Sequence, residues 1–317
     1  MLAYLIKRVL SLLPVLLVVT VVLFLMIHIT PGNPAAAILG IEASQEEIDA
    51  LSEALGLNRP IHEQYLHWVS GVLRGDLGQS LFMRQPVTQA IAGHLAPTLS
   101  LALLAQIIAI IIAIPVGMLA AYRRGTLTDA ALMGFSLLGM AVPSFLLGLF
   151  LMLVVGVHLQ WLPVAGYAPI SQGFGAHLKH LILPGISLGA IQAALITRIT
   201  RSSLLDNLGL NYIKTARAKG LPEGTILLKH AFRNAFLPIL TVVGQTFGTL
   251  VTGAVVVESI FNIPGLGQLI LNSVLRRDFA VIQGVVLVVT LMYVLLNLFI
   301  DLLYGAVDPR VRLDQKS

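Results

Sequence analysis

The sequence of 317 residues has no cysteine and little charge. The absence of cysteine excludes disulfides, thiolate catalysis, iron–sulfur clusters and cysteine zinc sites. Charged residues make up only 11% of the chain and hydrophobic residues 57%, whereas a soluble domain carries roughly 25% charged residues. The mean hydropathy is +0.89. Too little polar surface remains to cover a soluble globule, so the composition predicts a chain embedded in a lipid bilayer.

Several motifs of enzymes and nucleotide-binding proteins are absent as well. The chain has no GxxxxGK(S/T) loop to hold nucleotide phosphates, no HExxH zinc motif and no GxSxG nucleophile turn. We therefore expect this chain to have no ATPase activity, no catalytic residue, no metal and no cofactor of its own. The net charge of +5 comes from loops that flank apolar segments, so we expect no binding to nucleic acid.

Six apolar stretches without Asp, Glu, Lys or Arg are candidates for helices that cross the bilayer, which need roughly 20 residues. They are Val9 to Ile29, Leu95 to Tyr122, Ala130 to Val157, Leu181 to Thr197, Ala235 to Val257 and Ala280 to Ile300. The first is too long for the core of a secretory signal, so we interpret it as a retained helix. With six helices both termini share one side, and that side holds most of the basic residues, which places both termini in the cytoplasm.

The long external segment from Thr30 to His94 contains signals for two short helices. Ser44 and Glu47 form a capping box, and a second helix is expected to begin near Pro60. This second helix would carry Tyr65 and Trp68 on one apolar face. The segment is interpreted as a small folded element, with a position flat on the bilayer surface as the alternative.

The polar segment between the fourth and fifth spans reads RSSLLDNLGLNYIKTARAKGLPEGTILLKHAFRNAFLP. We expect Asn211 to cap a short helix that Gly220 ends, and Pro222 to open a second helix that continues into the fifth span. The short helix presents a stripe at helical spacing, made of Tyr212, Thr215, Ala216 and Lys219. Such a face suits the groove of a partner protein, but a basic loop that binds lipid headgroups fits the pattern equally well.

Five motifs along the chain resemble one protein family, and the first to be described, the coupling loop, consists of two stretches. YIKTARAKGL and KHAFRNAFLP are similar to the coupling loop of the dipeptide, oligopeptide, glutathione and nickel branch of binding-protein-dependent ABC importer permeases, and the chain resembles the first of their two permease chains. The other motifs are LLPVLLVVTVVLFLMIHITPGNPA, LGLNRPIHEQYLHWVSGVLRGDLGQS, VVVESIFNIPGLGQL and DPRVR. One departure is that Lys214-Thr215-Ala216 stands where the general importer loop begins Glu-Ala-Ala, which leaves open which residues meet the ATPase.

The resemblance implies an all-α membrane protein with six transmembrane helices, the type I ABC importer permease fold. The expected parts are an N-terminal helix with the external segment (1–94), a core of five helices (95–307) with the coupling loop at about 206–233, and a cytoplasmic tail (308–317). The expected location is the bacterial inner membrane. The implied partners are a second, homologous permease chain, two P-loop ATPases that bind ATP and Mg²⁺, and an external substrate-binding protein.

The resemblance and the polarity of the spans together predict roles for particular residues. Contact with the ATPase is expected for Tyr212, Thr215, Ala216, Arg217, Lys219, Gly220, His230, Arg233 and Asn234. Polar residues inside the spans are candidates for the lining of the pathway: Gln192, Gln245, Thr249 and Asn297. An external gate is expected at Glu258, Asn262, Pro264 and Gly265, with plain helix capping as the alternative. Asp301 is expected to pair with Arg198 or Arg201, because buried carboxylates are usually matched by cations.

The resemblance leaves the cargo open between peptides, including glutathione, and nickel chelates. Peptides are favoured because the external segment lacks a histidine-rich run, and histidine is a preferred ligand of nickel. A secondary transporter that works alone is a further alternative, which would predict inverted repeats with broken helices. The coupling-loop motif argues against it.

Overall fold

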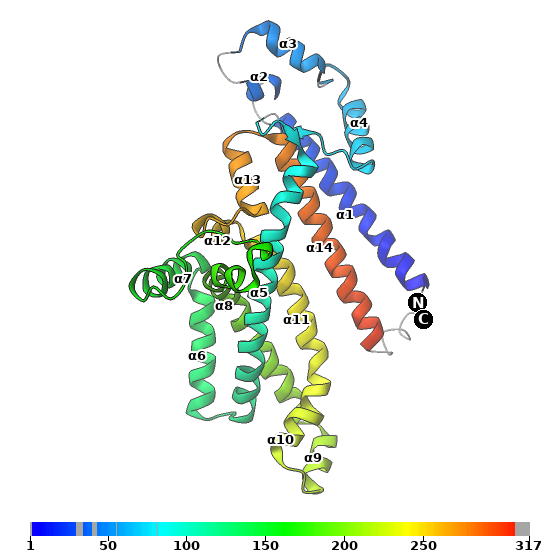
Figure 1. The fold of residues 1–317 in the computed structure, drawn as a ribbon. Coiled ribbons are helices and arrows are strands. Elements are labelled where there is room, and N and C mark those ends of the chain that lie inside the picture. Colours follow the sequence, from blue (N-terminus) through cyan, green and yellow to red (C-terminus); the bar gives the residue numbers. More distant parts are fainter. Residues whose placement is uncertain (1, 30–33, 40–42, 55, 81, 308–317) are drawn as a thin grey trace. The chain divides into compact units, whose positions relative to one another are not determined.

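The computed structural model describes residues 2–29, 34–39, 43–54, 56–80 and 82–307, which are almost entirely helical (Figure 1). The elements are α1 Leu2–Ile29, α2 Pro34–Leu39, α3 Gln45–Ala54, α4 Ile61–Leu73, β1 Gln79–Ser80, β2 Gln85–Pro86, α5 Val87–Tyr122, α6 Leu127–Ala141, α7 Ser144–Leu151, the π-helix η1 Met152–His158, the 3-10 helix η2 Ile170–Gln172, α8 Phe174–Leu208, α9 Asn211–Ala218, α10 Glu223–Thr225, the π-helix η3 Ile226–Ala231, α11 Phe232–Gly253, α12 Val255–Ile260, α13 Leu266–Leu275 and α14 Phe279–Val307. The all-α prediction is confirmed.

Among the described residues, five helices are long and apolar enough to cross a membrane. A sixth span results if α6 and the α7–η1 helix are counted as one. The sequence predicts that span as one helix from Ala130 to Val157, but the two halves are bent by 98°. Pro143 explains the break, because the residue before a proline is driven out of helical geometry. Val142 is extended at φ −82° and ψ 121°.

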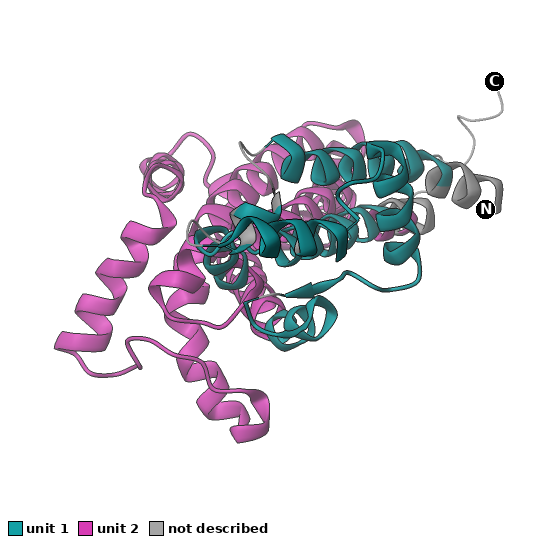
Figure 2. Cartoon of the chain, turned by 90° about the horizontal axis from the view of Figure 1, so that it is seen from above, with its two compact units in different colours: residues 1–96, 268–298 teal, residues 97–267, 299–317 magenta. Residues whose placement is uncertain are grey.

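The chain divides into two compact units (Figure 2). Unit 1 contains residues up to 96 together with 268–298, and unit 2 contains 97–267 together with the residues after 298. Helices α5, α13 and α14 each contribute to both units. The N-terminal helix and the external segment therefore belong to unit 1, and the coupling segment belongs to unit 2.

In unit 1, helix α4 packs against α1, which contains a candidate membrane span. The ring of Tyr65 meets the ring of Phe24 edge-on at 5.4 Å, and Trp68 lies 6.2 Å from the same ring. The hydroxyls of Thr20 and Tyr65 are hydrogen bonded at 2.9 Å. The apolar face predicted from the sequence thus contacts protein, which supports a folded element.

The predicted capping box at the start of α3 is confirmed. Ser44 N–H donates to the Glu47 carboxylate at 2.8 Å, and Glu47 N–H donates to the Ser44 hydroxyl at 3.3 Å. The two hydrogen bonds satisfy donors that a helix start leaves without partners. The Ser44 N–H, followed by its hydroxyl, holds the pKa of the Glu47 carboxyl below its ordinary value.

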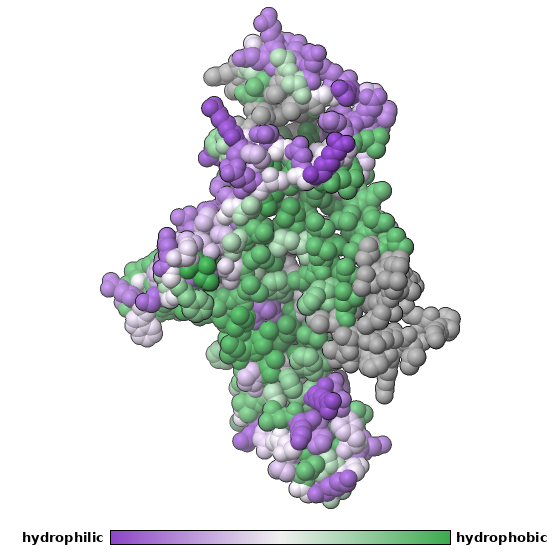
Figure 3. Space-filling view, turned by 45° about the vertical axis from the view of Figure 1, so that its right-hand side comes forward, coloured by the Kyte–Doolittle hydropathy of each residue, from purple (hydrophilic) through white to green (hydrophobic). Residues whose placement is uncertain are grey.

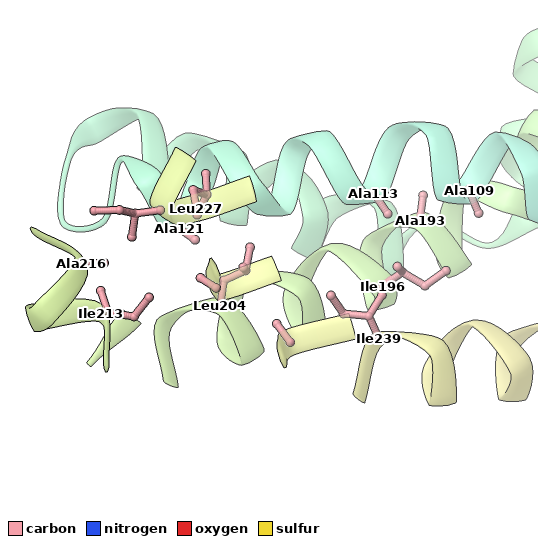
Figure 4. Close-up of a cluster of buried hydrophobic side chains, with 13 residues drawn as sticks. Ala109, Ala113, Ala121, Ala193, Ile196, Leu204, Ile213, Ala216, Leu227 and Ile239 are labelled. Carbon is pink, nitrogen blue, oxygen red and sulfur yellow. The ribbon is translucent and has the colours of Figure 1, made fainter. Parts of the chain in front are cut away.

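In unit 2, α5 and α8 run parallel with their backbones in close contact. A side chain at Gly189 would place its Cβ 2.6 Å from the Ala105 carbonyl oxygen, and one at Gly117 would lie 2.7 Å from Thr200 Cβ. Between these two points the small residues Ala109, Ala113 and Ala193 are buried (Figure 4). Small residues four apart let two membrane helices approach this closely, and dispersion contacts then stabilise the pair.

Candidate functional site

The short helix α9 is held at both ends by the local sequence. It begins after Leu210, which is extended, and Gly220 ends it with φ +74°. Gly220 N–H donates to Arg217 O at 2.9 Å, and Leu221 N–H donates to Ala216 O at 3.3 Å. A residue without Cβ suits this left-handed turn, so the stop predicted at Gly220 is confirmed. The predicted cap is wrong: Asn211 is the first helical residue, and no side chain caps the helix.

One face of α9 is part of the hydrophobic core of unit 2. Ile213 is fully buried and Ala216 is 7% exposed, and both belong to a cluster with Leu204 and Leu227 (Figure 4). The stripe predicted from the spacing is therefore divided. Ala216 lies three residues after the buried Ile213 and so shares its side of α9, which packs against the core and anchors the helix. Tyr212, Thr215 and Lys219 remain exposed.

Side-chain hydrogen bonds join α9 to the two helices that flank it. Tyr212 OH donates to the Asn207 amide oxygen of α8 at 3.2 Å and accepts from the Asn234 amide of α11 at 2.9 Å. Arg217 donates to the Glu223 carboxylate of α10 from Nε at 2.7 Å and from Nη2 at 3.2 Å. This carboxylate raises the pKa of Arg217 above its ordinary value. Sequence reasoning missed Asn207 and Glu223.

The exposed polar residues of this end of unit 2 form what we call the α9 surface. It consists of Tyr212, Thr215, Arg217, Lys219, Gly220, Arg233 and Asn234. In Figure 3 hydrophilic residues gather at the end of unit 2 that carries α9 and α10. His230 is half-buried within η3. Single-turn π-helices inside α-helices are rare and occur frequently at functional sites.

Two of the predicted pathway residues are brought together. The Gln192 amide of α8 donates to the Thr249 hydroxyl of α11 at 3.0 Å, and Thr249 donates to Thr246 O at 2.7 Å. Thr246 in turn donates to Gln106 of α5 at 3.3 Å. A polar chain thus crosses three helices of unit 2. Gln106 and Thr246, both buried, were polar span residues that the sequence alone did not rank as pathway lining.

The other two predicted pathway residues are not part of this chain of hydrogen bonds. Gln245 is exposed on α11. Asn297 belongs to unit 1, where its side-chain amide donates to Tyr293 O of its own helix at 3.0 Å. Their predicted role in lining the pathway stays a prediction.

Two of the four residues predicted as an external gate, Glu258 and Gly265, are buried in a hydrogen-bonded cluster. Glu258 is 0% exposed, and its carboxylate accepts from the Thr98 hydroxyl at 2.6 Å and from Gly267 N–H at 2.8 Å. The Thr98 hydroxyl accepts from Leu266 N–H at 2.7 Å. A Cβ at Gly265 would lie 2.3 Å from the carboxyl carbon of Glu258. The carboxylate binds the first turn of α13, as the capping alternative expects, and the gating role of these residues stays a prediction.

Asn262 and Pro264 lie at the exposed part of the same turn. Asn262 has a positive φ of +50°, a conformation that asparagine adopts more readily than most residues. Ile263 N–H returns to Glu258 O at 2.8 Å. The turn is therefore held to Glu258 twice, by Ile263 N–H at the backbone carbonyl and by Gly267 N–H at the carboxylate. Sequence reasoning missed Thr98, which lies 160 residues from Glu258 and shares no motif with it.

The predicted pairing of Asp301 with Arg198 or Arg201 stays a prediction, but Arg201 has a partner that the sequence did not indicate. Arg201 donates to both oxygens of Asp129, from Nε and Nη2 at 2.7 Å each, and joins α8 to the start of α6. The Asp129 side chain is only 7% exposed, so this bidentate pair is shielded from water. The side chain of Asp301 lies outside the described residues.

Residues 113–313 match the family described as the binding-protein-dependent transport system inner membrane component. Residues 1–102 match the N-terminal part of the binding-protein-dependent transport system membrane component. Together the two matches cover nearly the whole chain, in the order that the sequence motifs predict.

Two similar relatives extend over the full length. The probable peptide ABC transporter permease y4tP of Sinorhizobium fredii is 41% identical over 309 residues, which cover 98% of this chain and 99% of that protein. The glutathione transport system permease GsiC of Salmonella choleraesuis is 42% identical over 312 residues, with the same coverage. A solved structure of the MetNI methionine ABC transporter has a TM-score of 0.59 at 18% identity, and covers 69% of this chain and 97% of the solved chain.

Proposed function

The chain belongs to the family of binding-protein-dependent transport system inner membrane components, and on that premise we propose how it works in an ABC importer. It is a permease subunit, a multi-pass component of a bacterial inner membrane transporter, and its relatives are peptide and glutathione permeases. The predicted family, fold and general function are confirmed.

The α9 surface is the site at which the chain binds a partner ATPase. The observation that carries this proposal is the way α9 is held: its inner face is buried at Ile213 and Ala216, and its outer residues are exposed and polar. A helix that is anchored by its own core and exposes a polar face resists displacement, so it can transmit force from a partner. A loop that only attracts lipid headgroups would not require such an anchor.

Movement of α9 is transmitted to the membrane helices through the contacts described above. Tyr212 is hydrogen bonded to side chains of α8 and α11. Arg217 donates a hydrogen bond to Glu223 of α10, at the start of the α10–η3–α11 helix. When ATP binding closes the ATPase pair, α9 moves as a lever, and α8 and α11 turn with it. The Gln192–Thr249 contact between these two helices then changes, which alters access to the pathway.

The cargo that fits best is a di- or oligopeptide or glutathione, delivered by an external binding protein. Support comes from the full-length similarity to a probable peptide permease and to glutathione permeases. A nickel chelate is the alternative cargo. Half of the pathway comes from this chain and half from a second permease chain, two ATPases bind ATP and Mg²⁺, and both termini lie in the cytoplasm with the α9 surface.

Photo-crosslinking tests the docking site. Thr215→Cys places a unique thiol on α9, because the chain has no cysteine of its own. Thr128→Cys is the matched control, since it makes the same exchange at an exposed position at the start of α6. With a benzophenone attached, the complete complex should give a crosslink from position 215 to the ATPase subunit and none from position 128. A crosslink to lipid alone from position 215 would contradict the proposal.

Gly220→Val tests the lever itself. Any side chain here is strained, because φ is +74°, and the left-handed conformation costs an L-residue about 1–2 kcal/mol. Gly224→Val is the control, as no atom lies within 4 Å of its Cβ position and its φ is not in the positive range. We expect reduced uptake with Gly220→Val only. Normal uptake together with normal stimulation of ATPase by the binding protein would disprove the lever.

A further inference from the structure

A half-open cavity of about 320 Å³, at whose mouth Arg198 and Ser202 are exposed, lies between α6 and α8 in unit 2. It is lined by Met133, Leu195, Arg198, Ile199, Arg201 and Ser202. This volume falls at the lower end of the roughly 300–1,000 Å³ typical of small-ligand sites, and an apolar lining with a few polar groups is their usual composition. None of these residues belongs to the α9 surface, and the cavity has no part in the hydrogen-bonded chain from Gln192 to Gln106.

Arg198 is the unusual member of this lining. It directly follows the apolar stretch that ends at Thr197, within the 35-residue helix that is a candidate span, and lies ten residues, or about 15 Å, before the end of α8. Its guanidinium contacts the sulfur of Met140 at 3.7 Å, and no carboxylate of the described residues pairs with it. Cations within a membrane span are costly and usually face a water-filled cavity or a ligand. Arg198 is therefore available to an anion.

Arg201 is a second cation at the cavity, but its guanidinium is held in place by Asp129. Two of its donors are used by Asp129, which fixes the guanidinium at the edge of the cavity. Asp129 cancels one positive charge, so the cavity keeps an excess of one from Arg198. Ser202, which is exposed, supplies a hydroxyl at the same wall. A cation and a hydroxyl beside apolar side chains suit a ligand with a carboxylate and small side chains.

The cavity lies on the face of α8 that carries Gln192. The lining residues 195, 198, 199 and 202 recur at intervals of three and four, which places them along one side of the helix, and Gln192 precedes Leu195 by one turn at the edge of this side. Ala193, Ile196 and Thr200 lie on the buried side of α8, and Gln192, four residues before Ile196, lies at the boundary between the two sides. The wall of the cavity is thus continuous with the predicted pathway residue Gln192, about one turn away from Leu195.

We propose that this cavity is a transient binding site on the transport pathway, which we call the station, and that Arg198 binds the carboxylate of the peptide cargo there. The inference rests on the proposed function and deepens it by naming the group of the cargo that is recognised. Arg198 supplies the charge-assisted hydrogen bonds, Ser202 a further hydroxyl, and Met133, Leu195 and Ile199 contact the side chains of the peptide. The station holds released cargo against return to the binding protein.

Accessibility of an introduced thiol gives a direct test. Ser202→Cys is made in the complete complex in nanodiscs of defined lipid composition, and its labelling by a charged maleimide is followed on this chain. We expect alanyl-alanine or S-methylglutathione, whichever the complex transports, to slow labelling at least threefold, and the corresponding C-terminal amide to have no effect. The protection should vanish in the combined variant with Arg198→Gln.

Uptake supplies the second readout. Arg198→Gln should lower ATP-dependent peptide uptake about tenfold, the change expected for one charge-assisted hydrogen bond, while stimulated ATPase activity is retained and Arg198→Lys restores part of the uptake. Arg123→Gln removes the same charge from the exposed turn after α5 and should leave uptake unchanged.

Three results would overturn the proposal. The first is unchanged labelling in the presence of a peptide that the complex does transport, which would leave the proposed function intact. The second is labelling that depends on the phosphatidylglycerol content of the nanodisc and not on peptide, which would assign the cavity to a lipid phosphate. The third is a complex that accumulates neither peptide, which would refute the peptide cargo itself and this station with it.

Discussion

Gly189→Ala should loosen the pairing of α5 and α8, on which the core of unit 2 depends. The added Cβ would lie 2.6 Å from the carbonyl oxygen of Ala105 and 3.4 Å from its carbonyl carbon. These are backbone atoms that cannot rotate away, so one helix must shift. Gly134→Ala makes the same exchange on α6, where nothing lies within 4 Å of the new Cβ.

The two variants together isolate the steric cost. In an open helical position alanine is more favourable than glycine by about 1 kcal/mol, so Gly134→Ala should be neutral or slightly stabilising. The same gain applies at Gly189, but overpacking of a close helix contact costs about 1–3 kcal/mol. Subtracting the change in unfolding free energy of one variant from that of the other cancels the gain in helix propensity, so the difference reports the cost of overpacking.

Thermal unfolding of the purified complex measures this difference. At roughly 2–4 °C of Tm for each kcal/mol in a domain of this size, Gly189→Ala should unfold several degrees below Gly134→Ala. Equal Tm values for the two variants would refute the argument that α5 and α8 touch through their backbones.

Three further predictions concern hydrogen bonds and charge. Arg201→Gln leaves Asp129 buried without its partner and should cost about 3–5 kcal/mol; the double variant with Asp129→Asn should recover part of the lost Tm, and no recovery would argue against the pair. Glu258→Gln replaces one of two buried acceptor oxygens with an NH2 donor, so Thr98 or Gly267 N–H loses its acceptor, and the change should cost about 1–3 kcal/mol. Hydrogen exchange at Gly267 should rise, and an unchanged rate would contradict the contact. The pKa of the Glu47 carboxyl is lowered in the folded chain. The stability that the ionised carboxylate adds to α3 is therefore present above the unfolded pKa and is lost as pH falls through the folded pKa. Exchange protection in the first turn of α3 should therefore fall on acidification, and Glu47→Gln should remove most of this pH dependence.

The parts of the fold that depend on nearby residues could be predicted from the sequence. The capping box at Ser44 and Glu47 and the helix stop at Gly220 are each specified within a few positions, and the structure confirms both. The apolar spans were identified for the same reason, since hydropathy is a property of a continuous stretch. The 98° bend at Pro143 was not predicted, because its size depends on how the two helix halves pack against their neighbours.

Contacts between distant residues could not be predicted. The pairs Arg201–Asp129 and Glu258–Thr98 are 72 and 160 residues apart, and neither partner's local sequence points to the other. The orientation of α9 was also wrong in part. Spacing alone gave a stripe that included Ala216, whereas the fully buried Ile213 decides which side of so short a helix faces the core.

Reconstitution of the complete transporter in proteoliposomes tests the central claim most directly. The complex contains this chain, the second permease and two ATPases, and accumulation of labelled peptide is followed with and without ATP and the external binding protein. We predict accumulation only when both ATP and the binding protein are present. Peptide flux through this chain alone, without ATP, would contradict its role as a permease subunit driven through the α9 surface.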